Sequence, residues 1–315
     1  MSTPRESQAA GTVLLVRPVA FHGNPETAAS NAFQRPPAAA DPAAEQAAAS
    51  LEFDGLVAAL TGAGVEAIVV PDTAQPPTPD SIFPNNWVSF HADGTAVLYP
   101  MMAPSRRAER RHDILERLSR EYGFRIDRVL DFSAHEREGR FLEGTGSMVL
   151  DRAHRVAYAC LSPRTDLEVL AEVAQQLDYE PLAFTAVDRA GVPVYHTNVL
   201  MCVGRDFAVL CEEAIPDAGQ RAAVRHRLEQ CGHEVVPIRH AQMASFAGNL
   251  LELAGAGGER LLALSARALD ALDDVQRATL EARCRLLAAP VAMIEEGGGG
   301  SVRCMLAEVH LPRRD

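Results

Sequence analysis

A unit of paired strands and a helix recurs along this chain of 315 residues, with first strands expected near residues 87, 147, 199, 250 and 304. The spacing is roughly 50 to 60 residues, a period typical of architectures that repeat one supersecondary unit. Each unit contains two short apolar runs that predict a hairpin, then a helical segment, then a further short strand. We therefore expect five units in a radial array. A doubly wound sheet would instead alternate single strands with helices.

The first unit illustrates the pattern. Apolar runs at 87–91 and 96–99 flank the Asp93-Gly94 pair, which is a strong signal for a hairpin turn. A charged amphipathic helix is expected after them, at about 106–122. The helices of the later units are expected near 165–177, 217–231 and 270–287, and short closing strands at 66–70 and 234–238.

The domain organisation follows from the repeat. We expect a polar, frayed end at residues 1–10 and one catalytic domain over 11–315. Repeated prolines exclude a long helix from most of the segment at about 22–50, and a loop of that length in a compact protein is usually a lid or disordered. We expect a lid there, with a helix beginning near Pro42 and ending near Leu60.

Composition excludes several classes of function. Lys and Arg number 30 against 42 Asp and Glu, so the net charge is −12, whereas nucleic acids and anionic membranes need clustered positive charge. No apolar run approaches the roughly 18 residues of a membrane span, and the N-terminus lacks a signal-peptide core. The six cysteines form no C-x-x-C pair. We expect a cytoplasmic protein with reduced thiols that binds no metal, nucleic acid or membrane.

Polar residues cluster just before each first strand. If the five units are related by rotation, these clusters converge on one axis, and a pocket where chain segments meet is the usual ligand site. The predicted central pocket contains Asp80, Asn86, Glu143, His196, Asn198, Asn249 and Cys304.

Three of these residues form a nucleophilic set. His196 can move a proton for the thiol of Cys304, and Glu143 can orient a group or accept a hydrogen bond. Four glycines at 297–300 allow the backbone before Cys304 to approach a ligand closely. Singly, a cysteine at a strand start is most often a small buried hydrophobe, and Glu143 beside Gly144 could be a turn residue. Their shared position in the repeat favours catalysis, and it separates Cys304 from the other five cysteines, which we expect to be structural.

From about Leu14 to Leu311 the chain resembles the guanidino-group-modifying superfamily of arginine deiminases, dimethylarginine dimethylaminohydrolases and amidinotransferases. The resemblance implies a single-domain α/β fold, a five-bladed pseudo-fivefold β/α propeller called a pentein, in agreement with the repeat. Residues 31–34 and 84–87 look most like the branch that includes citrulline hydrolases. The motifs that carry the resemblance are Asp80-x-x-Phe83, Phe141-Leu-Glu143-Gly144, His196-x-Asn198 and the glycine run into Cys304.

The resemblance also implies roles. Cys304 would attack the central carbon of a guanidinium or ureido group, His196 would protonate the leaving amine and then activate water, and Glu143 would hydrogen-bond the nitrogens. Arg164 would clamp the substrate α-carboxylate, which a guanidinium fork binds bidentately; a solvated residue near a helix start is the alternative. No cofactor is implied, and a homodimer is a family-level expectation. The other substrate-binding candidates are Asp80, Phe83, Asn86, Asn198 and Asn249.

Two departures from the family point to a neutral substrate. Asn198 stands where arginine deiminases carry aspartate, and Asn86 stands where the dimethylarginine enzymes carry an acid. A buried guanidinium favours carboxylates, whereas a neutral urea suits the mixed donors and acceptors of an amide. We therefore expect a hydrolase of a ureido or guanidino amino acid, with citrulline, converted to ornithine, ammonia and CO2, as first choice. Arginine or a substituted arginine is second, and an amidinotransferase or a non-catalytic amino-acid-binding propeller remain alternatives.

Overall fold

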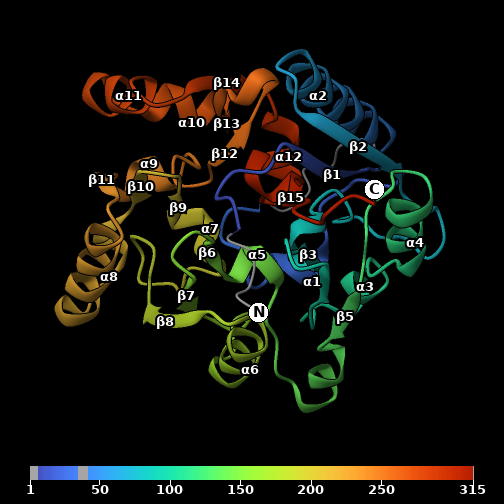
Figure 1. Ribbon diagram of the computed structural model, residues 1–315, viewed down its shortest axis with the longest axis horizontal. Coiled ribbons are helices and arrows are strands. Elements are labelled where there is room, and N and C mark those ends of the chain that lie inside the picture. Colours follow the sequence, from blue (N-terminus) through green and yellow to red (C-terminus); the bar gives the residue numbers. More distant parts are fainter. Residues whose placement is uncertain (1–5, 35–41, 315) are drawn as a thin grey trace.

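The computed structural model describes residues 6–34 and 42–314. These residues form five three-stranded sheets, which follow one another around the middle of the molecule with the longer helices outside them (Figure 1). In every sheet the middle strand pairs antiparallel with one neighbour and parallel with the other. The expected mixed α/β class is confirmed, and each sheet repeats one pattern of pairing.

The strands fall into three sets. The first strands, several of which pack against one another across the middle, are β3 (Val88–Phe90), β6 (Val149–Asp151), β9 (Met201–Val203), β12 (Leu251–Ala254) and β15 (Ala307–Glu308). The middle strands are β4 (Thr95–Leu98), β7 (Val156–Leu161), β10 (Phe207–Leu210), β13 (Arg260–Ser265) and β1 (Thr12–Arg17). The outer strands are β5 (Arg128–Asp131), β8 (Glu180–Thr185), β11 (Glu234–Pro237), β14 (Arg285–Ala289) and β2 (Glu66–Pro71).

The fifth sheet joins the two ends of the chain. Its first strand, β15, comes from the C-terminal region, and Leu14 of β1 lies opposite Ala307 in antiparallel register. β1 then pairs in parallel with β2 over its whole length. Because the partners are almost the full chain apart, no local pattern in the sequence could indicate this pairing, which joins the two ends of the chain in one sheet.

Helices cover the outside of the sheets where they were expected, with two differences. The helices expected near 165–177 and 217–231 are present, and the one beginning near Pro42 is also confirmed. The segment 106–122 is divided into two helices. The longer outer helices are α2 (Pro42–Gly62), α4 (His112–Arg120), α6 (Leu167–Leu177), α8 (Ala218–Gln230) and α11 (Asp274–Glu281). The shorter helices of the molecule are α1 (Pro25–Ala28), α3 (Pro104–Arg107), α9 (His240–Met243), α10 (Ala266–Ala271), α12 (Ala292–Gly298), η2 (Ser133–Glu138), η3 (Glu212–Ala214) and η4 (Ala256–Gly258).

The helix expected over 270–287 is wrong in its second half. α11 ends at Glu281, and residues 285–289 form β14, paired in parallel with β13. Leucine and alanine favour helices by only a few tenths of a kcal/mol, so pairing with a buried neighbouring strand overrides that preference. No helix within 6–34 and 42–314 is long and apolar enough to cross a bilayer.

A single helical turn precedes four of the first strands, and these turns meet in the middle of the molecule. α5 packs against η1 and α7, and η1 packs against η5. Cys304 therefore lies in a helical turn before β15 rather than at the strand start we expected. The four turns are η1 (Pro84–Asn86), α5 (Gly144–Ser147), α7 (Thr197–Leu200) and η5 (Val302–Met305).

The N-terminal segment differs from the frayed end expected over 1–10. In its described part, residues 6–10, Glu6 and Gln8 are buried, and the Gln8 amide donates to the carbonyls of Leu150 and Val203. Leu150 is the middle residue of β6 and Val203 is the last residue of β9. The segment thus connects two first strands that pack against each other.

Only part of the segment 22–50, expected to be a lid, is a loop. Residues 25–28 form α1 and residues from 42 onward belong to α2, while 35–41 lie outside the described residues. The described part up to residue 34 lies over the helical turns and contributes side chains to the pocket described next.

Candidate active site

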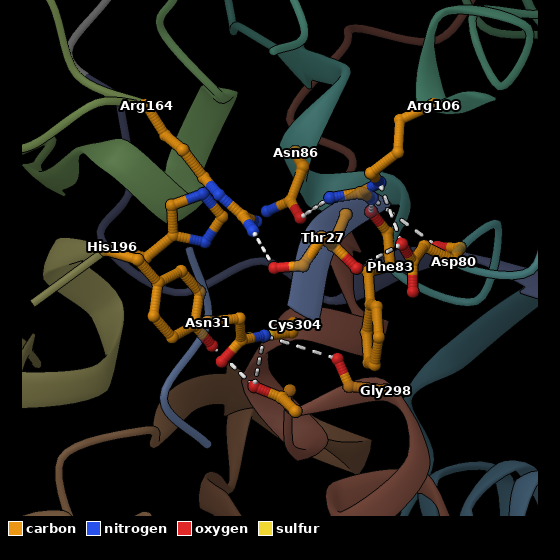
Figure 2. Close-up of a pocket in the computed structure, with 13 residues that line it drawn as sticks. Thr27, Asn31, Asp80, Phe83, Asn86, Arg106, Arg164, His196, Gly298 and Cys304 are labelled. Atoms are coloured by element: carbon orange, nitrogen blue, oxygen red, sulfur yellow. Dashed lines mark hydrogen bonds and ion pairs between the residues drawn. The ribbon is translucent and has the colours of Figure 1, made fainter. Parts of the chain in front are cut away.

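A small cavity lies where the helical turns meet (Figure 2). Six of the nine residues predicted for the site line it directly, and the other three, Glu143, Asn198 and Asn249, lie behind the lining and bond to it. The lining residues are Thr27, Asn31, Asp80, Phe83, Asn86, Arg106, Arg164, Tyr195, His196, Gly298, Gly299, Gly300 and Cys304.

Two side-chain amides hold the sulfur of Cys304, which is only 3 % exposed. Nδ2 of Asn249 lies 3.3 Å from Sγ, and Nδ2 of Asn198 lies 3.5 Å from it. Oδ1 of Asn249 accepts from the backbone N–H of Arg303, and Nδ2 also donates to the Asn198 carbonyl at 2.9 Å, which fixes the amide with Nδ2 beside sulfur. Amide donors stabilise negative charge that develops on a sulfur atom. The arrangement suits a nucleophilic thiolate.

His196 and Glu143 form a buried pair, with Nε2 and Oε2 separated by 2.8 Å. Burial alone would raise the pKa of Glu143, but Arg164, His196 and Arg106 outweigh it and hold that pKa well below its usual range. Burial lowers the pKa of His196 to about 4, although Glu143 opposes this. The imidazole is therefore neutral at neutral pH and can accept a proton, after which the carboxylate stabilises the imidazolium.

Asp80 lines the cavity, and one of its two carboxylate oxygens lacks a hydrogen-bond donor among the described residues. Its Oδ2 accepts from Nδ2 of Asn24 at 2.8 Å and from the hydroxyl of Thr27 at 3.3 Å. Its Oδ1 is buried and has no hydrogen-bond partner among the described residues. A buried carboxylate oxygen without a donor is costly. It is therefore an acceptor suited to the N–H groups of a guanidino or ureido ligand.

Arg106 is a central site residue that the sequence analysis did not single out. Its guanidinium makes two 2.9 Å hydrogen bonds to Glu109 and donates from Nη1 to Oδ1 of Asn86 at 2.8 Å. Asp80 and Glu143 lie within 3.8 Å of it. Arg106 is turned inward from α3, whereas Arg107, Arg110 and Arg111, which follow it in the same charged stretch, are only half-buried.

Arg164 is buried, only 2 % exposed, so the alternative of a solvated residue is wrong. Its guanidinium donates to the Thr27 carbonyl at 3.1 Å and to the Ser30 hydroxyl at 2.7 Å. It also lies 5.1 Å from the ring centre of Tyr195. Arg164 thus connects the loop after α1 to the pocket, and a ligand carboxylate could replace the serine hydroxyl.

Three other lining residues lacked a strong signal in the sequence. Asn31 donates from Nδ2 to the carbonyls of Gly298 and Gly299, and the Tyr195 hydroxyl also donates to Gly299. These contacts hold the glycine run before Cys304. Tyr195 could have been found because it adjoins His196, whereas Thr27 has no such neighbour.

Gly146 allows two predicted site residues to approach each other. A Cβ at this position would lie 2.5 Å from Nδ2 of Asn86 and 2.7 Å from Nδ1 of His196. We expect Gly146→Ala to lower kcat/KM at least about tenfold, because displacement of catalytic groups by a fraction of an ångström is costly. Steady-state kinetics measures this. In the control Gly55→Ala, the new methyl would meet nothing within 4 Å, so activity should be unchanged. Equal kinetics for both variants would contradict the packing argument.

A family model described as N,N dimethylarginine dimethylhydrolase, eukaryotic, matches residues 17–311 of the chain. A search of curated proteins gives no match. Several solved structures share the fold, at identities low enough that the likeness concerns the fold alone.

The apo structure of ArgZ, an arginine dihydrolase from the ornithine-ammonia cycle in cyanobacteria, has a TM-score of 0.73 and 17 % identity. The match covers 96 % of this chain and 41 % of that one, so the chain spans less than half the length of ArgZ. The substrate-bound N-terminal domain of ArgZ matches with a TM-score of 0.72 and 16 % identity, over 95 % of this chain and 97 % of that domain. A dimethylarginine dimethylaminohydrolase variant in adduct with S-methyl-L-thiocitrulline has a TM-score of 0.63 and 14 % identity. That match covers 95 % of this chain and 99 % of the other one.

Proposed function

The chain belongs to the N,N dimethylarginine dimethylhydrolase family, within the guanidino-group-modifying superfamily, and on that premise we propose that it is a cysteine-dependent hydrolase of guanidino or ureido C–N bonds in a free amino acid. The observation that carries the proposal is the placement of Cys304, beneath two amide donors, in one pocket with the His196–Glu143 pair. The common strand order of the five sheets supports the five-bladed propeller that this family implies.

The geometry suits a two-step displacement. The substrate head group donates N–H groups to Oδ1 of Asp80 and to Glu143, which places its central carbon near sulfur. His196 takes the thiol proton of Cys304, and sulfur attacks the carbon. The resulting imidazolium returns the proton to the departing nitrogen, which leaves as an amine and yields a thiouronium, or an S-carbamoyl group from a ureido substrate. His196 then removes a proton from water, which attacks the same carbon and releases the thiolate.

The charges around the head group favour a cationic guanidinium as the first substrate. Asp80, Glu109 and Glu143 share the buried cations Arg106 and Arg164, so three carboxyl groups face two guanidinium groups, and Oδ1 of Asp80 is left without a donor among the described residues. A buried excess of carboxylate is stabilised by a cation. This changes the order expected from the sequence, since we now place arginine or a substituted arginine before citrulline. ArgZ, which shares the fold, is an arginine dihydrolase, and this supports the same order.

Citrulline remains the second candidate, because of Asn86 and Asn198. Oδ1 of Asn86 bonds to Arg106 and the amide of Asn198 bonds to the Cys304 sulfur, so neither adds a negative charge that would oppose a neutral urea. Hydrolysis of arginine at a terminal nitrogen yields a ureido product in the same pocket. One site can therefore carry out both hydrolyses, with ornithine, two ammonia and CO2 as final products.

A substrate panel tests the proposal. The purified protein is incubated separately with arginine, dimethylarginine, citrulline and agmatine, and ammonia, citrulline and ornithine are measured. We expect turnover of a guanidino amino acid, with ornithine formed from citrulline if the second candidate also holds. Binding without turnover would identify a non-catalytic propeller, and transfer of the amidino group to an added amine would identify an amidinotransferase. Either result would overturn the proposal.

Arg164 is expected to recognise the substrate carboxylate. Replacing it with alanine should raise KM for the preferred amino acid about 10- to 100-fold, the worth of a charge-assisted hydrogen bond of about 1.5–3 kcal/mol. Agmatine lacks a carboxylate, so the preference of the enzyme for arginine over agmatine should largely disappear in Arg164→Ala. Arg117→Ala, which removes an exposed arginine paired with Glu121, is the control. An unchanged arginine-to-agmatine ratio in Arg164→Ala would rule out the carboxylate contact.

A further inference from the structure

A second cluster of chemically reactive side chains lies away from the pocket, between two neighbouring sheets. Asp151 ends β6, and His154 lies in the turn that leads to β7, with Nδ1 2.9 Å from Oδ1 of Asp151. Cys231 caps the C-terminal end of α8, whose following strand belongs to the next sheet. The candidate ligand atoms of these three residues all lie within 4.8 Å of one another. None of them lines the pocket around Cys304.

Two buried neighbours point into this cluster. His233 is buried, and its Nε2 lies 2.7 Å from Oδ2 of Asp151. Together with the backbone N–H of His154, which donates to Oδ1 at 3.0 Å, it fixes the carboxylate, and Nδ1 of His154 lies about equally close to both oxygens. The Tyr158 hydroxyl is fully buried and has no hydrogen-bond partner within the part of the chain that the structure describes. Asp151 pairs with Val156 in antiparallel register, so Tyr158, two residues further along β7, projects from the same face of the sheet as Asp151. An unpartnered hydroxyl at this depth is costly.

We propose that Asp151, His154 and Cys231 bind a divalent cation of the zinc class, with the Tyr158 hydroxyl or a water molecule at the fourth position. One carboxylate, one imidazole and one thiolate form a ligand set typical of tetrahedral zinc. Magnesium and calcium prefer oxygen ligands only, so the thiol disfavours them. His233 acts as the outer hydrogen-bond partner that orients the ligating carboxylate.

The geometry and the charges allow binding with small movements. Tetrahedral bonds of zinc to nitrogen, oxygen and sulfur place ligand atoms roughly 3.3–3.6 Å apart, whereas the present separations reach 4.8 Å. The His154 side chain is 38 % exposed, so it can rotate and also leaves an entry path for the ion. The negative charges of the Asp151 carboxylate and the Cys231 thiolate together neutralise the cation.

Binding must release a proton. Zinc binds the thiolate, whereas a free thiol is largely protonated at neutral pH. The metal–sulfur bond forms as the S–H bond breaks, and the proton goes to solvent. Because the ligands come from two neighbouring sheets, the bound ion would cross-link them.

Cobalt(II) binding tests the proposal. The titration uses the Cys304→Ser protein, which removes the catalytic thiol as a competing ligand. We expect a thiolate-to-cobalt charge-transfer band in the near ultraviolet and intense visible bands typical of tetrahedral cobalt, both bleached by zinc. Adding Cys231→Ser should abolish the charge-transfer band, and adding His154→Ala should weaken affinity at least tenfold. The control Cys284→Ser removes another thiol outside the cluster and should leave the spectrum unchanged.

Two results would overturn the assignment. One is the absence of a charge-transfer band in the Cys304→Ser protein at millimolar cobalt, and the other is a band that survives Cys231→Ser. To separate loss of binding from loss of fold, Cys231→Ser is also made in the protein with intact Cys304, where substrate turnover should be unchanged. Zinc should raise the melting temperature of the Cys304→Ser protein but not that of its Cys231→Ser derivative.

Discussion

Replacing Cys304 with serine is expected to lower kcat by at least about 10⁴-fold, because removing the nucleophile of a covalent mechanism leaves only binding and electrostatic contributions. Serine is nearly isosteric, and the Asn198 and Asn249 amides that bond to the sulfur can bond to a hydroxyl oxygen instead. The fold and the binding of substrate should therefore persist. Steady-state kinetics and isothermal titration calorimetry measure the two effects separately.

The matched control is Cys231→Ser, which removes a half-buried thiol outside the pocket and should keep full turnover. A Cys304→Ser protein that turns over substrate at more than a few per cent of the original rate would contradict the assignment of the nucleophile. Loss of substrate binding together with turnover would instead mean that Cys304 supports the pocket structurally.

The largest effect on stability is expected from Glu6→Gln. Glu6 is 4 % exposed and lies 2.6 Å from Nη1 of Arg152, which is itself fully buried. Removing one partner of a buried ion pair leaves an uncompensated charge and typically costs 3–5 kcal/mol. Glu308 still lies 3.4 Å from Arg152, so we expect about 3 kcal/mol. Denaturant unfolding of the two proteins measures the difference.

The stability lost in Glu6→Gln should depend on pH. Burial alone would raise the pKa of Glu6, but Arg152 and His91 outweigh it and hold that pKa far below its usual range. The stability that the ionised Glu6 contributes is therefore fully present above its unfolded pKa of about 4.3 and is lost as the pH falls below it. The difference between the original protein and Glu6→Gln should shrink in the same direction.

Glu259→Gln provides the control for this effect, since Glu259 forms a two-bond ion pair with Arg285 at the surface. Exposed ion pairs contribute little, so this variant should unfold like the original protein. If the free energy of unfolding of Glu6→Gln is also unchanged, the buried contacts of the N-terminal segment do not stabilise the protein.

The periodicity of the sequence predicted much of the candidate site. Cys304, His196 and Glu143 precede different first strands, and rotation about one axis brings equivalent positions together. The helical turns that contain or adjoin them do meet in the structure. A short motif at each position would have been weak evidence alone. The three residues were identified together because they occupy equivalent positions in the repeated unit.

Residues that do not occupy the repeated position before a first strand could not be predicted in the same way. Arg106 lies in a short helix after a hairpin, and it enters the site because Glu109 and Asn86 bind its guanidinium. Thr27 belongs to the loop that Arg164 holds over the pocket. Such placements depend on contacts between segments distant in sequence, which leave no periodic pattern.

The elements of the fold could likewise be predicted only where the local sequence determines them. Hairpins and outer helices follow from local alternation and turn residues, whereas β14 was mistaken for helix because its leucines and alanines favour either structure. The burial of Glu6 and the pairing of β1 with β15 depend on partners at the far end of the chain. These are tertiary effects that local propensity does not contain.

The central claim, a covalent intermediate on Cys304, is tested most directly by mass spectrometry of protein quenched in acid during turnover of arginine. We expect a substrate-derived adduct that maps to the peptide containing Cys304. The adduct should be absent from Cys304→Ser. Turnover with no adduct at any time point, or an adduct on another residue, would contradict the account.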